Sequence, residues 1–344
     1  MNTDDFALLE KFDPEMVELT RMEEERQLST INIIASENFA SPLASVMEGS
    51  IWANKNTEGY PGRRFVAGCE LADRIENLAI ERAKQLFGAE HANVQPMSAT
   101  VGNIAVLNAL LKPGDTLLSM ELTHGGHLSH GAAFHYSGKM FKPVFYGVNK
   151  KSELIDFDQV RRLAEEHKPK MIICGCSSYP RQIDYAAFAE IAKSVGAILF
   201  VDLAHNVGLV AAGLIPSPFP HADVVSTSTH KTFRGPRGGG LILCKKEHAA
   251  KIDRAIFPGI QGAAKVDMIA ARAVLFKECM TDEFKAYSRQ VISNAKALAQ
   301  GCAQQGMRLV AGGTDTHLVV VDVTKHSVNG KEAEAALESV GIIC

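Results

Sequence analysis

The chain has 344 residues, of which 46% are hydrophobic and 22% are charged. This composition is typical of a folded protein with a large core, and the length suggests about two domains. The formal net charge of −3 gives no reason to expect nucleic acid or an anionic membrane as a partner. No apolar run reaches the roughly 18 residues of a membrane span. Seven scattered cysteines, an odd number, favour reduced thiols in a cytoplasmic protein.

The N-terminal part of the chain predicts an arm followed by helices. Asp13, followed by proline, is typical of a helix start. The segment behind it is rich in Glu and Arg, so we expect residues 1–38 to form an arm on the surface or on a partner subunit. An amphipathic helix then spans Leu71 to Leu86 and ends at Gly88.

Strands and helices alternate in the central part of the chain. Continuous apolar runs predict strands buried on both faces, and capping side chains such as Asp156 and Asp184 begin helices. This alternation predicts an α/β fold with an open, mostly parallel sheet and helices on both sides. Ligands of such sheets bind at the carboxyl ends of the strands. The predicted strands cover residues 116–120, 171–174, 197–201, 223–225 and 241–243.

The pattern changes near residue 281, where a long helix begins. A strand at residues 318–323 and a helix at residues 331–340 follow it. We therefore expect a large domain over residues 39–280 and an incomplete, truncated small α+β domain over residues 281–344.

One lysine stands between small hydroxyl residues and a glycine-rich turn, within residues 226–240. Because Lys231 follows a short strand, it enters a loop rigid enough to aim its side chain. Such a lysine forms a Schiff base with an aldehyde where its surroundings favour the neutral amine. Neighbouring hydroxyl and N–H groups suit a phosphate, and an aldehyde with a phosphate describes pyridoxal 5'-phosphate (PLP). The alternative is a surface lysine in a Gly/Pro loop.

Other groups that PLP requires lie at predicted strand and helix ends. Asp202 ends a strand and can keep the pyridine nitrogen protonated; alternatively it caps the next helix. Ser98 and Thr100 open a helix whose N-terminus suits phosphate, although Ser98 alternatively is a plain N-cap. Three histidines within residues 124–130 have a spacing that could suggest a metal, but the glycines between them favour a loop. An imidazole lying on a flat cofactor is the better interpretation.

Nine short motifs, in order along nearly the whole chain, make the sequence resemble the serine hydroxymethyltransferase family. The resemblance implies a PLP-dependent transferase with the aspartate aminotransferase-like fold, called fold type I. It also implies a homodimer that interconverts serine and glycine with tetrahydrofolate. The motifs are Ile34–Asn38, Glu58–Gly62, Gly68–Glu70, His124–Leu128, Val201–His205, Gly208–Gly213, Thr229–Thr232, Gly235–Gly239 and Phe257–Gly259.

The resemblance implies a role for each matching residue. Lys231 would hold PLP covalently, and Glu58 would move a proton during Cα–Cβ cleavage. His127 would stack on the ring, and His230 would tune reaction specificity. The expected cofactor contacts are Ser98, Ala99, Thr100, His127, Ser177, Asp202, His205, Ser228, His230, Lys231 and, from a neighbouring subunit, Gly262. The expected substrate contacts are Ser36 and Glu58 for the amino acid and Leu122, Gly126 and Leu128 for the folate; no metal is expected.

The sequence also departs from the family pattern. Asn56 and Val66 replace two tyrosines, and the phosphate loop reads Ser98-Ala99-Thr100 instead of Ser-Gly-Ser. The arginine that clamps the substrate carboxylate would lie beyond Cys344, so the chain is either truncated or a diverged relative. Two alternatives therefore remain open. One is a folate-independent threonine aldolase or transaldolase, or an α-methylserine hydroxymethyltransferase; the other is a noncatalytic homologue.

Overall fold

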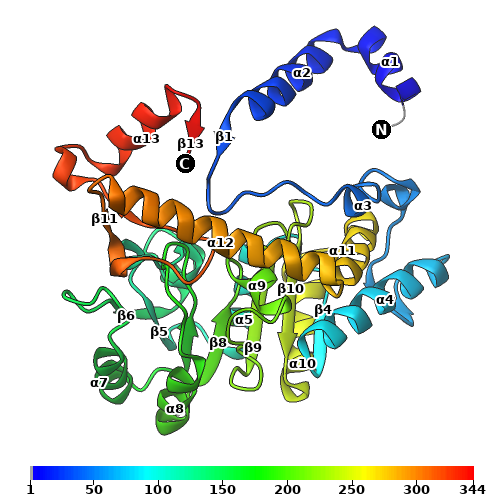
Figure 1. The fold of residues 1–344 in the computed structure, drawn as a ribbon. Helices are drawn as coiled ribbons and strands as arrows, with labels where there is room; N and C mark the ends of the chain where they lie inside the picture. Colours follow the sequence, from blue (N-terminus) through cyan, green and yellow to red (C-terminus); the bar gives the residue numbers. More distant parts are fainter. Residues whose placement is uncertain (1–2) are drawn as a thin grey trace. The chain divides into compact units, whose positions relative to one another are not determined.

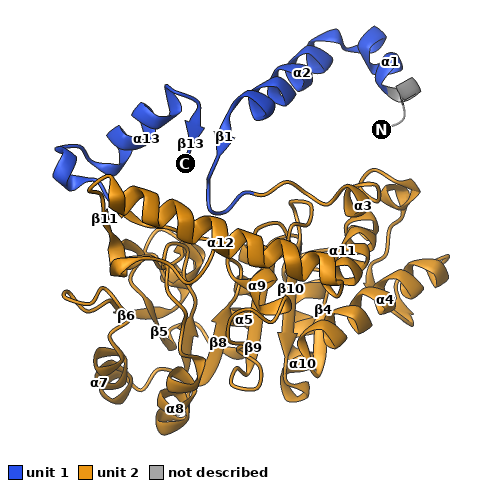
Figure 2. Ribbon diagram, in the orientation of Figure 1, with its two compact units in different colours: residues 1–37, 322–344 blue, residues 38–321 orange. Residues whose placement is uncertain are grey.

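The computed structural model describes residues 3–344, and these divide into two compact units (Figure 2). The first unit comprises residues up to Glu37 together with Asp322–Cys344, and the second comprises Asn38–Val321. The three-part division expected from the sequence stays a prediction. In the described residues, no helix is both long and apolar enough to cross a membrane.

The first unit joins the two ends of the described chain through a short parallel pairing of β1 with β13. Its second helix begins where the sequence predicts, because the Asp13 side chain accepts a hydrogen bond from the Met16 N–H at 3.2 Å. The elements of this unit are α1 (Thr3–Phe12), α2 (Pro14–Ser29), β1 (Ile31–Asn32), α13 (Gly330–Glu338) and β13 (Ile342–Ile343).

A seven-stranded sheet forms the centre of the second unit, in the order β4-β10-β9-β8-β7-β5-β6 (Figure 1). The five strands from β9 to β6 pair in parallel, while β10 runs antiparallel to both of its neighbours. The mostly parallel α/β sheet predicted from the sequence is confirmed. The strands are β4 (His91–Asn93), β5 (Thr116–Met120), β6 (Lys142–Tyr146), β7 (Met171–Cys174), β8 (Ile198–Asp202), β9 (Val224–Ser228) and β10 (Gly240–Cys244).

Helices cover both faces of this sheet, and the strands divide their side chains between two cores. In β7, Ile172 packs in the core that contains Phe188, whereas Met171 and Ile173 pack in the core that contains Leu107. Successive residues of a strand point to opposite faces, which explains why the apolar runs are continuous. The helices are α3 (Pro42–Ser45), α4 (Glu70–Phe87), α5 (Ala99–Leu110), α6 (Tyr136–Met140), α7 (Phe157–His167), α8 (Tyr185–Val195), α9 (Val207–Ala211), α10 (Lys246–Arg254), α11 (Val266–Cys279) and α12 (Asp282–Gln304).

Short elements complete the fold, and some details differ from expectation. The predicted strand at residues 318–323 is reduced to β12 (Val321–Asp322), which pairs with β11 (Arg308–Leu309). The segment after Glu58 forms a hairpin of β2 (Gly59–Tyr60) and β3 (Arg63–Arg64). In α4 the buried residues are mainly alanines, so Leu71 and Leu78 of the predicted apolar stripe are exposed.

Candidate active site

Two neighbouring strands deliver polar groups to the carboxyl edge of the sheet. Asp202, the last residue of β8, pairs in register with Ser226 of β9, and Lys231 follows the end of β9 by three residues. Phe200 and Val224 pack in the core formed by α5, so strand alternation also directs Asp202 and Ser226 toward α5. The sequence prediction that Asp202 and Lys231 stand at adjacent strand ends is confirmed.

The Asp202 carboxylate is buried in a set of hydrogen-bond donors. Its Oδ2 accepts from Asn103 Nδ2 at 2.7 Å and lies 2.9 Å from His130 Nε2, and its Oδ1 accepts from the Ala204 N–H at 3.0 Å. Burial alone would raise the pKa of Asp202, but the hydrogen bond and charge of His130 lower it well below its ordinary value. Asp202 is therefore ionised, and since a carboxylate has about four acceptor positions, one remains for a further donor.

His127 lies beside this carboxylate as a neutral imidazole. Its Nδ1 accepts from the Ser129 N–H at 3.2 Å and lies 2.7 Å from Ser129 Oγ. Burial, followed by the charge of His130, lowers the pKa of His127 to about 4. A neutral imidazole suits the predicted stacking on an aromatic ring, because it brings little charge to the ring face.

Lys231 is mostly buried in the loop after β9, and its backbone oxygen accepts from Asn38 Nδ2 at 3.0 Å. Burial lowers the pKa of its amine, and the positive charge of Arg237 adds to this effect, while Asp202 opposes it. The neutral amine required for a Schiff base is therefore favoured. The pKa of the adjacent His230 is also lowered, to about 4, by burial and then by the charges of Arg237 and Lys231.

His205 faces the same loop and is paired with a histidine that the sequence analysis missed. The ring of His317 stacks on it at a centroid distance of 5.5 Å, and His205 Nδ1 lies 3.3 Å from His317 Nε2. Burial and the charge of Lys231 hold the pKa of His205 well below its usual range. His317 lies more than 80 residues beyond Lys231, in a segment without a chemical motif, so nothing in the sequence pattern pointed to it.

The predicted phosphate contacts lie at the start of α5, near the end of β9. Ser98 is the N-cap and accepts from the Val101 N–H at 3.1 Å, so the plain N-cap interpretation of Ser98 is confirmed as a structural role. The N–H groups of Ala99 and Thr100 have no acceptor within the helix. Gly240, opposite Ser228, lies so close that a Cβ would collide with the Ser98 oxygen. A glycine at this position is therefore required for the close packing of β10 against the start of α5.

The predicted folate loop lies beside the loop after β7. The Ser177 N–H donates to the Gly125 oxygen at 2.7 Å, and a Cβ at Gly126 would collide with the Met120 oxygen. Leu122 and Leu128 stand exposed on either side of these glycines. The loop thus presents two apolar side chains on a tightly packed backbone.

Glu58 and Gly262 are not joined to this cluster, and the structure does not test Ser36. Glu58 stands before the β2–β3 hairpin, and in the described chain its carboxylate makes no hydrogen bond with the cluster. Gly262 is exposed, with nothing within 4 Å of an added Cβ. Ser36 belongs to the other compact unit. Their roles stay predictions.

Asp202 brings a carboxylate to the histidine loop, which the sequence analysis did not foresee. His127, His130 and Asp202 place ligand-type atoms within 4.8 Å of one another, a geometry that could hold a metal. Hydrogen bonds already occupy one atom of each side chain: His127 Nδ1 lies 2.7 Å from Ser129 Oγ, and Asp202 Oδ2 lies 2.7 Å from Asn103 Nδ2 and 2.9 Å from His130 Nε2. The absence of a metal stays a prediction.

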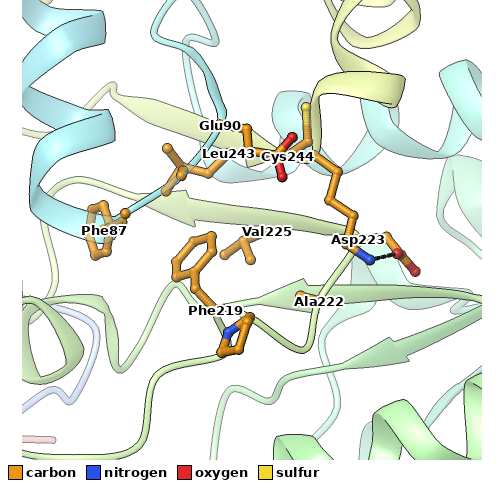
Figure 3. A pocket seen from close by; sticks show the side chains of 12 residues that line it. Phe87, Glu90, Phe219, Ala222, Asp223, Val225, Leu243 and Cys244 are labelled. Atoms are coloured by element: carbon orange, nitrogen blue, oxygen red, sulfur yellow. Dashed lines mark hydrogen bonds and ion pairs between the residues drawn. The ribbon is translucent and has the colours of Figure 1, made fainter.

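A pocket of about 360 Å³ lies at the amino ends of the parallel strands, opposite the ends that carry Asp202 and Lys231 (Figure 3). Phe87 and Phe219 line it, and their ring centroids lie 5.8 Å apart. An ion pair between Lys245 and Asp223 closes one side at 2.5 Å. No predicted site residue lines this pocket, so it is separate from the cluster around Lys231.

Comparison with known proteins agrees with this arrangement. The serine hydroxymethyltransferase family profile matches residues 9–344. The serine hydroxymethyltransferase of Coprothermobacter proteolyticus is 58% identical over 335 residues, which are 97% of this chain and 80% of that relative. The resemblance inferred from the motifs is confirmed. The chain therefore belongs to the serine hydroxymethyltransferase family of PLP-dependent transferases, and its sheet is that of fold type I.

Proposed function

We propose that the protein uses PLP to interconvert serine and glycine, with tetrahydrofolate as the one-carbon carrier. The observation that carries this proposal is the position of an ionised Asp202 at the end of β8 and of Lys231, whose amine has a lowered pKa, in the loop after the adjacent strand β9. Family membership supports the same reaction, and it rests on 97% of the chain.

The residues present fit PLP. Asp202 has an acceptor position left for a pyridinium N–H, and the start of α5 offers unpaired N–H groups to a phosphate. Lys231 supplies the amine for the aldehyde, and the neutral His127 supplies a flat face. His205, Ser228, Ser177 and His230 would complete the contacts. When bound, PLP provides an electron sink for the carbon next to the substrate amino group.

The chain's own residues then divide the remaining work. The ionised Asp202 would hold a proton on the ring nitrogen, and His127 would keep water from one face. Glu58 would hold or release the proton of the substrate hydroxyl. Ser36 would orient the amino acid, while Leu122, Gly126 and Leu128 would hold the folate. His230 would adjust which bond reacts.

We also propose a homodimer in the cytoplasm. Apolar side chains of α4 and of the 3-10 helix Ile51–Asn54 are exposed, including Leu71 at 58% and Ile51 at 77%. Such a surface suits a second copy of the chain. Glu58 and Gly262, which have no contact with the cluster in their own chain, would then serve the partner's site. The seven cysteines are free, as expected for a reducing compartment.

The decisive experiment measures glycine and methylenetetrahydrofolate formed from serine and tetrahydrofolate. We expect turnover that requires both PLP and folate. Rapid cleavage of threonine without folate, or turnover of α-methylserine in place of serine, would favour the alternative chemistry that Asn56 and Val66 leave open. PLP binding without any turnover would favour the noncatalytic homologue.

Lys231→Ala provides the matching test of the cofactor site. We expect borohydride reduction followed by peptide mass spectrometry to find PLP on Lys231 in the wild type and nowhere in the variant. Lys251→Ala, which changes an exposed lysine of α10, is the control and should keep the label. A label retained by Lys231→Ala would refute the lysine assignment.

A mixing experiment tests the shared site. Lys231→Ala and Glu58→Gln should each be inactive, because each lacks a group that every site requires. If a site takes Lys231 from one chain and Glu58 from the other, a mixed dimer regains one complete site. Activity that does not return after the two variants are unfolded and refolded together would contradict the shared site.

A further inference from the structure

A single buried amide connects the two side chains that face the ring in the proposed function. Asn103 lies within α5 and is 0% exposed. Its Nδ2 donates to Asp202 Oδ2 at 2.7 Å and to Ser129 Oγ at 2.8 Å, and its Oδ1 accepts from Ser226 Oγ. All of the amide's strong hydrogen-bonding directions except one acceptor position are thus used.

The orientation of this amide follows from chemistry. An ionised carboxylate can only accept hydrogen bonds, so the amide nitrogen, and not its oxygen, must face Asp202. The same nitrogen then donates its second hydrogen to Ser129. This leaves the Ser129 hydroxyl hydrogen for His127 Nδ1, 2.7 Å away.

The proton position on His127 follows in turn. Its Nδ1 also accepts from the Ser129 backbone N–H at 3.2 Å, and a backbone N–H can only donate. A neutral imidazole with an accepting Nδ1 carries its proton on Nε2. The chain of donation therefore runs from Asn103 through Ser129 to His127.

We propose that Asn103 is a positioning residue that holds the Asp202 carboxylate and, through the Ser129 hydroxyl, the neutral form of His127 in one hydrogen-bonded unit. The role of this unit in catalysis rests on the proposed function, in which Asp202 and His127 both contact the cofactor ring. The effect of Asn103 on the hydrogen bonds of Asp202 and His127 does not depend on that function, because it concerns only residues of this chain. A single amide serves both groups since it donates two hydrogens from one nitrogen, at an angle that spans the gap between β8 and the histidine loop.

The test uses cofactor-free protein labelled with ¹⁵N-histidine, in which NMR reports the tautomer and the pKa of His127. In the wild type we expect the Nε2–H tautomer and a pKa of about 4. Charged or titratable groups that act on this ring are His130, Asp202, Lys231 and His135. The Asn103→Asp variant described next keeps these four residues and adds a carboxyl group at position 103.

Asn103→Asp reverses the donation with almost no change in shape. The new carboxyl group shares a proton with Asp202, because two buried carboxylates this close do not both ionise, and its oxygen accepts the Ser129 hydroxyl hydrogen, which turns that hydrogen away from His127 Nδ1. The neutral imidazole thereby loses a hydrogen bond, while the Ser129 backbone N–H still donates to Nδ1. We therefore expect the protonation equilibrium of His127 to shift at least tenfold toward the charged form, with the neutral form remaining the Nε2–H tautomer. Ser226→Ala, which removes only the bond to Asn103 Oδ1, is the control and should leave the pKa of His127 unchanged.

Ser129→Ala keeps the proposal testable if Asn103→Asp does not fold. It removes the hydroxyl hydrogen bond to His127 while keeping the bond between Asn103 and Asp202, and it should likewise raise the pKa of His127, because the neutral ring loses that donor. A His127 pKa that is unchanged in either folded variant would overturn the proposal.

In the PLP-loaded protein, Asn103→Asp should lower kcat for serine at least tenfold with KM within about threefold, and it should displace the pH profile. If Asn103 had only a structural role, its replacement would lower the folded fraction of the protein and leave the pH profile of kcat unchanged. If the wild type has no serine turnover, the proposed function fails while the NMR result still decides the role of Asn103.

Discussion

The two ends of strands β8 and β9 carry charged groups in opposite surroundings. At the carboxyl end, the Asp202 side chain is 7% exposed and accepts from Asn103 and Ala204, with His130 2.9 Å away. At the amino end, Asp223 accepts from the Leu199 N–H at 2.8 Å and pairs with Lys245, whose side chain is 41% exposed. Both aspartates thus accept from a backbone N–H and lie beside a nitrogen-bearing side chain, but only one is removed from water.

This difference decides which aspartate can influence chemistry. In a buried site, Coulomb interactions are several times stronger than at the surface. Burial first, and neighbouring positive charges as well, lower the pKa values of His127, His205, His230 and Lys231, while the charge of Asp202 opposes the shift at His127, His205 and Lys231. Perturbed groups gathered at one sheet edge are typical of functional sites. The pocket at the other edge is open and rimmed by an ion pair that water screens.

Exchanging each aspartate for its amide gives the largest expected contrast. Asp202→Asn removes the charge that Asn103 and His130 face, and leaves nothing to hold a protonated ring nitrogen. We expect kcat for serine to fall by about 10²–10³-fold, as when a single electrostatic group is removed from an active site. Steady-state kinetics at saturating PLP would measure this.

Asp223→Asn is the matched control at the amino end of the same strands. The amide oxygen can still accept from the Leu199 N–H, so kcat should stay within about twofold. If Asp202→Asn and Asp223→Asn lowered kcat by similar factors, the difference in burial between the two strand ends would not explain which aspartate acts in catalysis.

The buried histidines predict how stability depends on pH. The folded-state pKa values of His127 and His230 are about 4, below the ordinary 6.5. Between these values the unfolded chain binds more protons than the folded chain, so the free energy of unfolding falls as the pH drops from 6.5 toward 4. A histidine that stays neutral in the folded state contributes up to about 1.4 kcal/mol per pH unit, and the partly exposed His127 and His230 contribute less. Asp202 adds nothing here, because its lowered pKa costs stability only below its ordinary 3.8.

Urea unfolding of the cofactor-free protein at pH 7, 6 and 5 would measure this slope. His127→Asn should reduce the slope by up to one proton, because it removes one of the titrating groups. A slope identical in wild type and variant would mean that His127 is solvated and not held neutral by burial.

The strand ends could be predicted from the sequence, whereas the connections between them could not. Continuous apolar runs predicted β7 and β8, an aspartate directly after the second run indicated Asp202, and a lysine between hydroxyl residues and a glycine-rich turn indicated Lys231. These signals are local, because period-2 alternation and strand ends are read within about ten residues. The motifs supplied the family, and with it the expected roles.

Residues that act only by tertiary contact left no such signal. Asn103 sits in a helix among apolar neighbours, where an asparagine alone suggests nothing, and His130 gained its role from a carboxylate 72 residues away. The exposed Leu71 shows that an apolar pattern can also predict burial where there is none. An apolar stripe on α4 looked like a core face, but alanines of the same helix fill the core.

Lys245→Ala should have the smallest effect on stability and turnover, and it tests the solvent-exposed ion pair at the amino ends of the strands. A partly exposed ion pair contributes about 0–1 kcal/mol to stability, because solvent screens the charges and the long side chain loses entropy when it is held. We expect the free energy of unfolding, measured with urea at pH 7, to change by less than about 1 kcal/mol, with kcat and KM unchanged.

Asp223→Ala should lower the free energy of unfolding more, by about 1–3 kcal/mol, because it leaves the Leu199 N–H of β8 without its acceptor. The ranking therefore follows the backbone hydrogen bond and not the ion pair. If Lys245→Ala instead slowed serine turnover several-fold, the pocket in Figure 3 would be coupled to the Lys231 cluster through β9, and the two strand ends would have to be treated as one site.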